Sequence, residues 1–96
     1  MKPTYDLKLI KGLMQQGSWG MTLSAEDGAI ELGFEDDDVY DCIVNHLEES
    51  HFHKTMASEK KAALMQDVYY ITYEGQQLYV KLQVSVDVVV VSFKKQ

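Results

Sequence analysis

The chain of 96 residues contains no arginine, and all nine of its basic residues are lysine. Without guanidinium groups, the protein has no planar fork for bidentate phosphate contacts or for stacking on bases. Its fifteen aspartates and glutamates leave a formal net charge of −6 and an isoelectric point of about 4.8. Because phosphate contacts need positive charge, this balance argues against a generic nucleic-acid-binding protein.

Cysteine and long apolar runs are also scarce. Cys42 is the single cysteine, which excludes an internal disulfide and fits a reducing cytosol. The valines at 88–91 form a run far shorter than the roughly 20 apolar residues of a membrane-spanning helix. Residues 1–6 lack the apolar region of a signal peptide. We therefore expect a cytoplasmic protein.

The residues that are present suffice for one folded unit. Hydrophobic residues make up 46% of the chain, as in a globular protein, and the length fits one domain over residues 1–96. The charge is unevenly distributed. Residues 1–50 hold three lysines against eleven acidic residues, whereas residues 51–96 hold six lysines against four. An anionic ligand is therefore expected to bind the second half.

The first half predicts helices. Thr4 is placed to cap a helix that ends at Gly17, and Ser24 to cap a second helix that ends at Gly33. The first helix has its apolar face at Leu9, Ile10, Leu13 and Met14, and the second at Ala25, Ala29, Ile30 and Leu32. Residues 18–23 are too short and glycine-broken for a helix and indicate an edge strand or a turn.

An acidic run at 35–38 leads into the clearest helical pattern of the chain. The apolar stripe has the spacing i, i+1, i+4, i+5, i+8 and consists of Val39, Tyr40, Ile43, Val44 and Leu47. The helix dipole favours carboxylates at an N-terminus. We interpret the run as a solvated helix start, because the ligand spacing and turn glycine of a Ca²⁺ loop are missing.

The second half changes to strand patterns. Residues 67–73, 78–84 and 88–93 predict three strands joined by short turns, which requires antiparallel pairing. Residues 51–65, which precede them, suggest a helical turn and then an exposed loop at 57–61. Helices followed by a meander predict an α+β fold of two layers.

Four short blocks of the second half resemble one protein family. In order and with unbroken spacing, they are Phe52–Met56 (FHKTM), Gln66–Tyr69 (QDVY), Tyr79–Lys81 (YVK) and Asp87–Lys94 (DVVVVSFK). In these blocks the chain resembles the MqsR toxins of bacterial toxin–antitoxin pairs. The resemblance implies a RelE-like fold, with N-terminal helices on a C-terminal antiparallel sheet. It also implies a sequence-selective, metal-independent mRNA endoribonuclease that inhibits translation and growth and is silenced by an antitoxin, expected to be a DNA-binding helix-turn-helix protein.

The resemblance also assigns an active site, consisting of Lys54, Gln66, Tyr79 and Lys94. Lys81, His53 and Lys95 are expected as further RNA contacts. Cleavage of this kind requires a base for the 2′-hydroxyl, donors for the growing negative charge and an acid for the leaving oxygen. Lysines supply positive charge, and a tyrosine hydroxyl or an amide can donate or orient. No cofactor is expected.

Strand alternation tests the position of these residues independently of the family resemblance. If Leu78, Val80 and Leu82 face the helices, Tyr79 and Lys81 face the open side of the sheet. On the last strand, Val89, Val91 and Phe93 suit the core, which would leave Val90, Ser92 and Lys94 on the open side. Tyr79, Lys81 and Lys94 are therefore predicted to share one exposed face.

Other interpretations stay open. One hypothesis is a Zn²⁺ site formed by His46, His51 and His53. Their spacing in the sequence does not define a ligand geometry, so we favour the interpretation that these histidines are exposed or cap helices. Cys42 is expected to be a small buried hydrophobe. Met65 stands where the family often has tryptophan. Together with the missing arginines, this substitution favours an alternative function, in which the protein is a weakly active or inactive toxin-fold module that binds an antitoxin or another protein. A third interpretation is ribosome-dependent cutting, in which the ribosome positions the mRNA.

Overall fold

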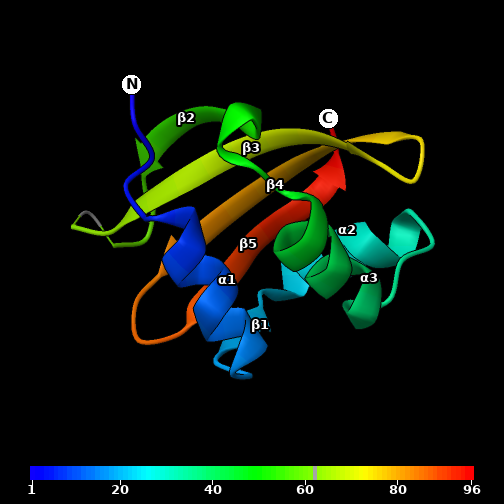
Figure 1. Ribbon diagram of the computed structural model, residues 1–96, viewed down its shortest axis with the longest axis horizontal. Helices are drawn as coiled ribbons and strands as arrows, with labels where there is room; N and C mark the ends of the chain where they lie inside the picture. The colour runs from blue at the N-terminus through cyan, green and yellow to red at the C-terminus, as the bar shows by residue number, and fades with distance from the viewer. Residues whose placement is uncertain (62) are drawn as a thin grey trace.

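A computed structural model describes residues 1–61 and 63–96 of the chain. The first half forms α1 (Leu7–Gln15), β1 (Trp19–Met21), α2 (Leu23–Glu31) and α3 (Asp36–Asp41), which continues into a π-helical turn, η1 (Cys42–His46). A 3-10 turn, η2 (Glu49–His51), leads to β2 (Phe52–Ala57), β3 (Met65–Tyr73), β4 (Gln76–Val84) and β5 (Val88–Lys95) (Figure 1). The prediction of an α+β fold with N-terminal helices on a C-terminal antiparallel sheet is confirmed.

One five-stranded sheet has the order β1-β5-β4-β3-β2. The three predicted strands are antiparallel neighbours, as expected, and β1 is the edge strand anticipated at 18–23, paired in parallel with β5. The prediction of a loop at 57–61 after a helical turn missed β2, which pairs antiparallel with β3 along Phe52–Ala57. Within the described residues no helix is long and apolar enough to cross a membrane.

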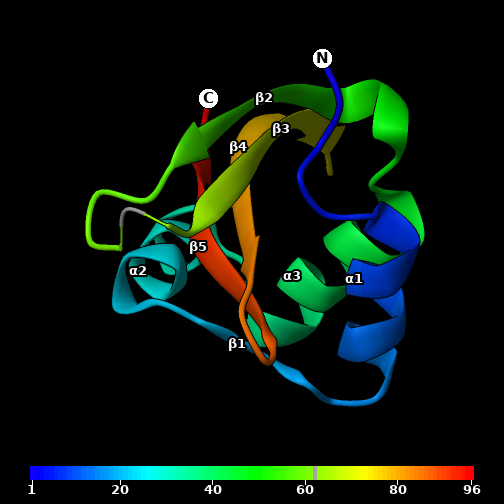
Figure 2. The ribbon, with the colours of Figure 1, turned by 90° about the vertical axis from the view of Figure 1, so that its left-hand side faces the viewer.

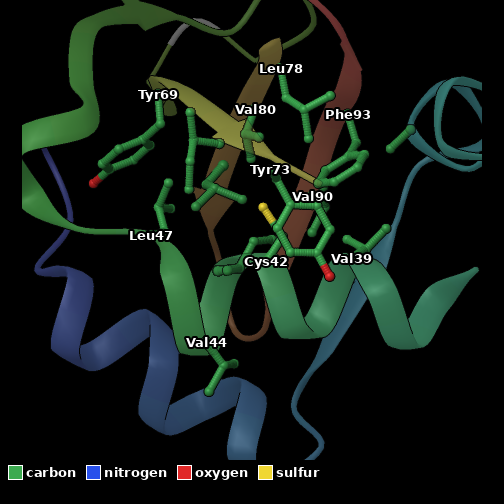
Figure 3. Close-up of a cluster of buried hydrophobic side chains, with 14 of the residues drawn as sticks. Val39, Cys42, Val44, Leu47, Tyr69, Tyr73, Leu78, Val80, Val90 and Phe93 are labelled. Atoms are coloured by element: carbon green, nitrogen blue, oxygen red, sulfur yellow. The ribbon is translucent and has the colours of Figure 1, made fainter. Parts of the chain in front are cut away.

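The helical stripe predicted from Val39 to Leu47 forms the centre of the core. Val39, Cys42, Ile43 and Leu47 are fully buried, and Val39, Cys42 and Leu47 point toward the sheet (Figure 3). Burial raises the pKa of the Cys42 thiol to about 12, which confirms the expectation of an inert buried cysteine. The acidic run starts the helix with a capping box, in which the Glu35 backbone N–H donates to the Asp38 carboxylate at 2.9 Å.

The helix starts differ from the predictions in their capping residues. Asp6 caps α1 in place of Thr4, and its carboxylate accepts from the Lys8 N–H at 3.0 Å. The Thr4 hydroxyl instead pairs with the Thr55 hydroxyl at 2.8 Å, and the backbone N–H groups of Thr4 and Tyr5 donate to the buried carboxylate of Asp67, each at 2.9 Å. Thr22 caps α2 in place of Ser24 and accepts from the Ala25 N–H at 3.1 Å.

The predicted helix ends and apolar faces had mixed outcomes. The ends are confirmed, since Gly17 and Gly33 have φ of 82° and 84°, in the left-handed region that glycine adopts freely. Leu9 and Ile30, predicted on apolar faces, are 52% and 70% exposed.

The free edge of β5 is covered by α2. The pairing with β1 stops at Val90, and beyond it the Thr22 hydroxyl donates to the Val91 carbonyl at 2.8 Å. Six residues further along, within α2, Gly28 packs directly on the backbone carbonyl of Phe93 and lies close to the Cβ of Lys94. In the edge-on view, α2 lies beside β5 while α1 and α3 lie on the other side of the strands (Figure 2). The helix thus protects an edge that would otherwise expose unpaired backbone groups.

Two core tyrosines make a matched pair for a stability test. The buried Tyr69 hydroxyl has no hydrogen-bond partner among the described residues, whereas the Tyr73 hydroxyl donates to Asp41 at 2.7 Å. We expect Tyr69→Phe to leave the free energy of unfolding unchanged or to raise it by up to about 1 kcal/mol, and Tyr73→Phe to lower it by about 1 kcal/mol. Urea denaturation measures both, and equal losses in the two variants would contradict the hydrogen bonding described here.

Candidate active site

The strand register arranges the open face of the sheet in three adjacent rows that run across β2 to β5. The aromatic row consists of His53, Tyr70, Tyr79 and Lys94. The lysine row consists of Lys54, Val68, Lys81 and Ser92. The amide row consists of Met56, Gln66, Gln83 and Val89. Residues directly opposite each other in a ladder point to the same face, so all three rows face away from α3.

The prediction that Tyr79, Lys81 and Lys94 share one face is confirmed, but the predicted parity of β5 is wrong at its first half. Val90 is fully buried and belongs to the core, whereas Val89 and Val91 are only half-buried. The register shifts at the Lys81/Leu82 step, because Lys81 pairs with Ser92 and Leu82 with Val90. Val91 is therefore the extra residue of a β-bulge. Because of this extra residue, the side chains that precede Val91 on β5 face the opposite sides from those predicted by simple alternation.

Tyr79 lies at the centre of the site. The ammonium nitrogen of Lys94 lies 5.0 Å from the centroid of the Tyr79 ring, and that of Lys81 lies 5.9 Å from it. At these distances the ring face attracts both cations and holds them near one another. The ring of Tyr70 lies 5.9 Å from that of Tyr79, and His53 stacks on Tyr70 with centroids 4.1 Å apart. The aromatic row is thus a continuous ring surface that ends at Lys94.

Burial and the nearby charges set the protonation of two groups. Burial, with a smaller contribution from Tyr70, raises the pKa of the Tyr79 hydroxyl, so it remains a donor at neutral pH. The pKa of Lys81 is lowered, first by burial and then by the positive charge of Lys94, although Glu59 partly opposes this. The smaller contribution of Lys94 reflects two cations close together, and a bound anion would relieve that repulsion.

The three remaining residues expected in the site have different positions on the sheet. Lys54 is exposed on β2, and its row continues through the fully buried Val68 to Lys81. Gln66 is buried on the same face at the start of β3 and donates from Nε2 to Oε1 of Gln83 at 2.9 Å. Lys95 is not brought to the cluster, because it pairs with the core residue Leu78 and its side chain therefore leaves on the opposite face to Lys94.

The three histidines lie apart in different environments. His46 is 3.4 Å from Asp41 and packs edge-on against Tyr73, while Nδ1 of His51 accepts the Glu48 backbone N–H at 2.9 Å. Across the part of the chain that the structure describes, no three His, Cys, Asp or Glu side chains gather as metal ligands. The favoured interpretation of exposed and capping histidines fits these contacts.

Tyr70 and Gln83 belong to the rows but were not anticipated as site residues. Gln83 follows from the alternation already visible in the sequence, since it comes two residues after Lys81, whereas Tyr70 is found only through the register that places it opposite Tyr79. What the sequence could not supply was the register between strands, which brings Tyr70 beside His53 and Gln83 beside Gln66.

An open sheet face that carries lysines around a tyrosine, backed by helices, defines a small α+β protein with a local cationic surface. Residues 2–95 match the family described as motility quorum-sensing regulator, toxin of MqsA. The chain is also similar to the mRNA interferase toxin MqsR of Escherichia coli (strain K12), with 37% identity over 93 residues that cover 97% of this chain and 94% of that protein. The chain belongs to the MqsR toxin family.

The depressed pKa of Lys81 leads to a pH test. Below its pKa Lys81 is charged and attracts phosphate. As the pH rises through that pKa, which lies below the ordinary 10.5, the charge is lost and affinity falls. We expect Kd for a 2′-deoxy-substituted oligonucleotide to rise between pH 7 and pH 10 in the wild type and to stay nearly flat in Lys81→Arg, because arginine remains charged. Fluorescence anisotropy measures both, and identical pH profiles would contradict a role for Lys81 in holding phosphate.

Proposed function

We propose that the protein is the toxin of a toxin–antitoxin pair and cleaves mRNA as an endoribonuclease, thereby inhibiting translation and growth. Membership of the MqsR family and the similarity to an mRNA interferase toxin support this function. The observation that carries it is the pair of ammonium groups held over the Tyr79 ring on the open face of an otherwise acidic protein. A phosphodiester placed there meets two cations and a hydroxyl donor at once.

In the proposed mechanism, Lys94 and Lys81 neutralise the charge that develops on the phosphate oxygens as the 2′-oxygen attacks phosphorus. The Tyr79 hydroxyl, kept protonated by burial, donates to the phosphate or to the leaving 5′-oxygen. Lys54 adds positive charge from the neighbouring strand, and Gln66 orients the site through its amide. His53 lies on the same ring surface, and its imidazole is the proposed base that takes the proton of the attacking 2′-hydroxyl.

The proposal includes partners and a location. The family description names the toxin of MqsA, so a cognate antitoxin is the proposed protein partner and mRNA the substrate. An antitoxin of the DNA-binding helix-turn-helix type and positioning of mRNA by the ribosome are finer parts of the same proposal. With few cations and no arginine, intrinsic RNA affinity should be modest and only weakly salt-dependent, which suits delivery of substrate by the ribosome. The cytoplasm is the compartment where such a substrate is found.

A second candidate function is a binding module without strong cleavage. The observation that favours it is a hollow of about 600 Å³ on α2 and the start of α3, where the exposed Leu23 and Ile30 lie among carboxylates. The lining carboxylates are Glu26, Asp27, Glu35, Asp36 and Asp37. An apolar surface with an acidic rim suits a basic protein partner.

Induced expression in bacteria separates the two functions. We expect the wild type to arrest growth, with new 5′ ends in cellular mRNA detected by primer extension, and we expect co-expression of an adjacent antitoxin gene to restore growth. Sustained growth at high expression, with intact mRNA, would contradict the nuclease and favour the binding module.

A further inference from the structure

A groove of about 340 Å³ adjoins the site at the amide row. It is lined by Lys81, Gln66 and Gln83 on the sheet, by Glu59 and its neighbours in the β2–β3 connection, and by the start of α2. Figure 2 shows that connection and α2 on the same side of the strands. Because Lys81 belongs both to the groove and to the cluster around Tyr79, the groove begins where the cluster ends.

The amide pair gives the groove a fixed hydrogen-bonding pattern. Gln66 donates from Nε2 to Oε1 of Gln83, which locks the two amides relative to one another. Oε1 of Gln66 and Nε2 of Gln83 have no hydrogen-bond partner among the described residues. The lining of the groove therefore offers one free amide acceptor and one free amide donor, the groups with which amides read base edges in RNA and DNA.

Two further features of the groove favour a base over a phosphate. The half-buried Val89 and Val91, exposed on this face by the bulge, supply an aliphatic surface for a flat ring. Glu59 lines the groove as well, and its carboxylate repels phosphate but accepts hydrogen bonds from the amino or imino groups of a base. Besides Lys81, the groove lining includes Lys60 and Lys61 in the β2–β3 connection, and these cations suit the phosphates on either side of the bound base.

We propose that this groove binds the base of a nucleotide adjoining the scissile phosphate, and that Gln83 is the residue that selects it. The inference rests on the proposed nuclease function and goes beyond it by naming a specificity site. Gln83 itself reaches no reacting atom, so its substitution should alter which sequence is cut more than how fast the preferred chemistry proceeds.

Gln83→Glu is the sharpest test, because the carboxylate still accepts from Gln66 Nε2 while the free donor of the groove becomes an acceptor. Gln77→Glu is the matched control, since Gln77 lies on the same strand and the same face and receives the same change of charge. Purified proteins would cut a random-sequence RNA pool, and sequencing of the 5′ ends would give base frequencies around each cut.

We expect Gln83→Glu to change the preference at one position beside the cut by about tenfold, in line with the discrimination of one paired contact, and Gln77→Glu to keep the wild-type pattern. If Gln83→Glu cuts RNA with the wild-type base pattern, the groove assignment is wrong while the nuclease function stands. If the wild type makes no cuts with or without added ribosomes, the nuclease function and the groove both fail. Thermal melting of each variant shows that the pattern comes from folded protein, and Gln83→Leu, which removes the amide without adding charge, must alter the same position.

Discussion

Lys94→Ala is expected to lower the rate of RNA cleavage by about 100-fold or more, the usual effect of removing one group that stabilises transition-state charge. Lys94 is exposed on the last strand, so its removal should cost little stability. Its ammonium group lies 5.0 Å from the Tyr79 ring and with Lys81 forms the cationic centre of the site. Single-turnover cleavage of a labelled RNA measures the change.

The neighbouring residue supplies the control. Lys95→Ala removes the same charge one position further along the chain, but the register places Lys95 on the opposite face of the sheet. We expect its cleavage rate to stay within about threefold of the wild type, because only distant, screened charge is lost. Equal losses in Lys94→Ala and Lys95→Ala would mean that net charge alone matters. Tyr79→Phe, which keeps the ring and removes only the hydroxyl, should lose cleavage while leaving the lysines in place.

Gly28→Ala should be the most destabilising of the glycine substitutions. A Cβ at this position would lie well inside the contact distance of the Phe93 carbonyl oxygen and 3.3 Å from the Cβ of Lys94. The obstacle is backbone in a paired strand, which cannot move aside as a flexible side chain can. Overpacking of this kind costs about 2–3 kcal/mol, and urea denaturation measures it.

Gly12→Ala is the matched control for that substitution. Gly12 lies inside α1, and an added Cβ meets no heavy atom within 4 Å. We expect alanine here to stabilise the protein by about 0.5–1 kcal/mol, because it lowers the entropy of the unfolded chain and favours helix. A wild-type unfolding midpoint in Gly28→Ala would contradict the close packing of α2 on β5. Because α2 supports the backbone beside Lys94, cleavage should fall together with stability.

The sequence predicted most of the elements because their patterns are long and regular. The stripe from Val39 to Leu47 and the alternation in β4 each extend over enough residues to exclude the other kind of secondary structure. β2 was missed because a strand bearing His53, Lys54 and Thr55 at the edge of a sheet has little apolar alternation, and a bulge at His53 interrupts it. Its stability comes from pairing with β3, a long-range contact that no local pattern records.

The site was predictable only in part for the same physical reason. Alternation alone placed Tyr79, Lys81 and Lys94 on one face, but four consecutive valines at 88–91 carry no alternation from which a bulge could be located. The Thr4 hydroxyl, which was predicted to cap α1, instead pairs with the Thr55 hydroxyl fifty-one positions away, a contact that exists only in the folded protein. Likewise the partnership of Gln66 with Gln83 exists only in the folded register.

The most direct test of the central claim is an NMR titration of the labelled protein with a 2′-deoxy-substituted RNA that binds without being cut. If the open face holds the phosphodiester, the largest shift changes should fall on Tyr79, Lys81, Lys94 and the adjoining Gln83. Changes confined to α2 and α3, or to Lys95 and the helix-covered face, would show that the nucleic acid binds elsewhere and that the lysine–tyrosine cluster is not its site.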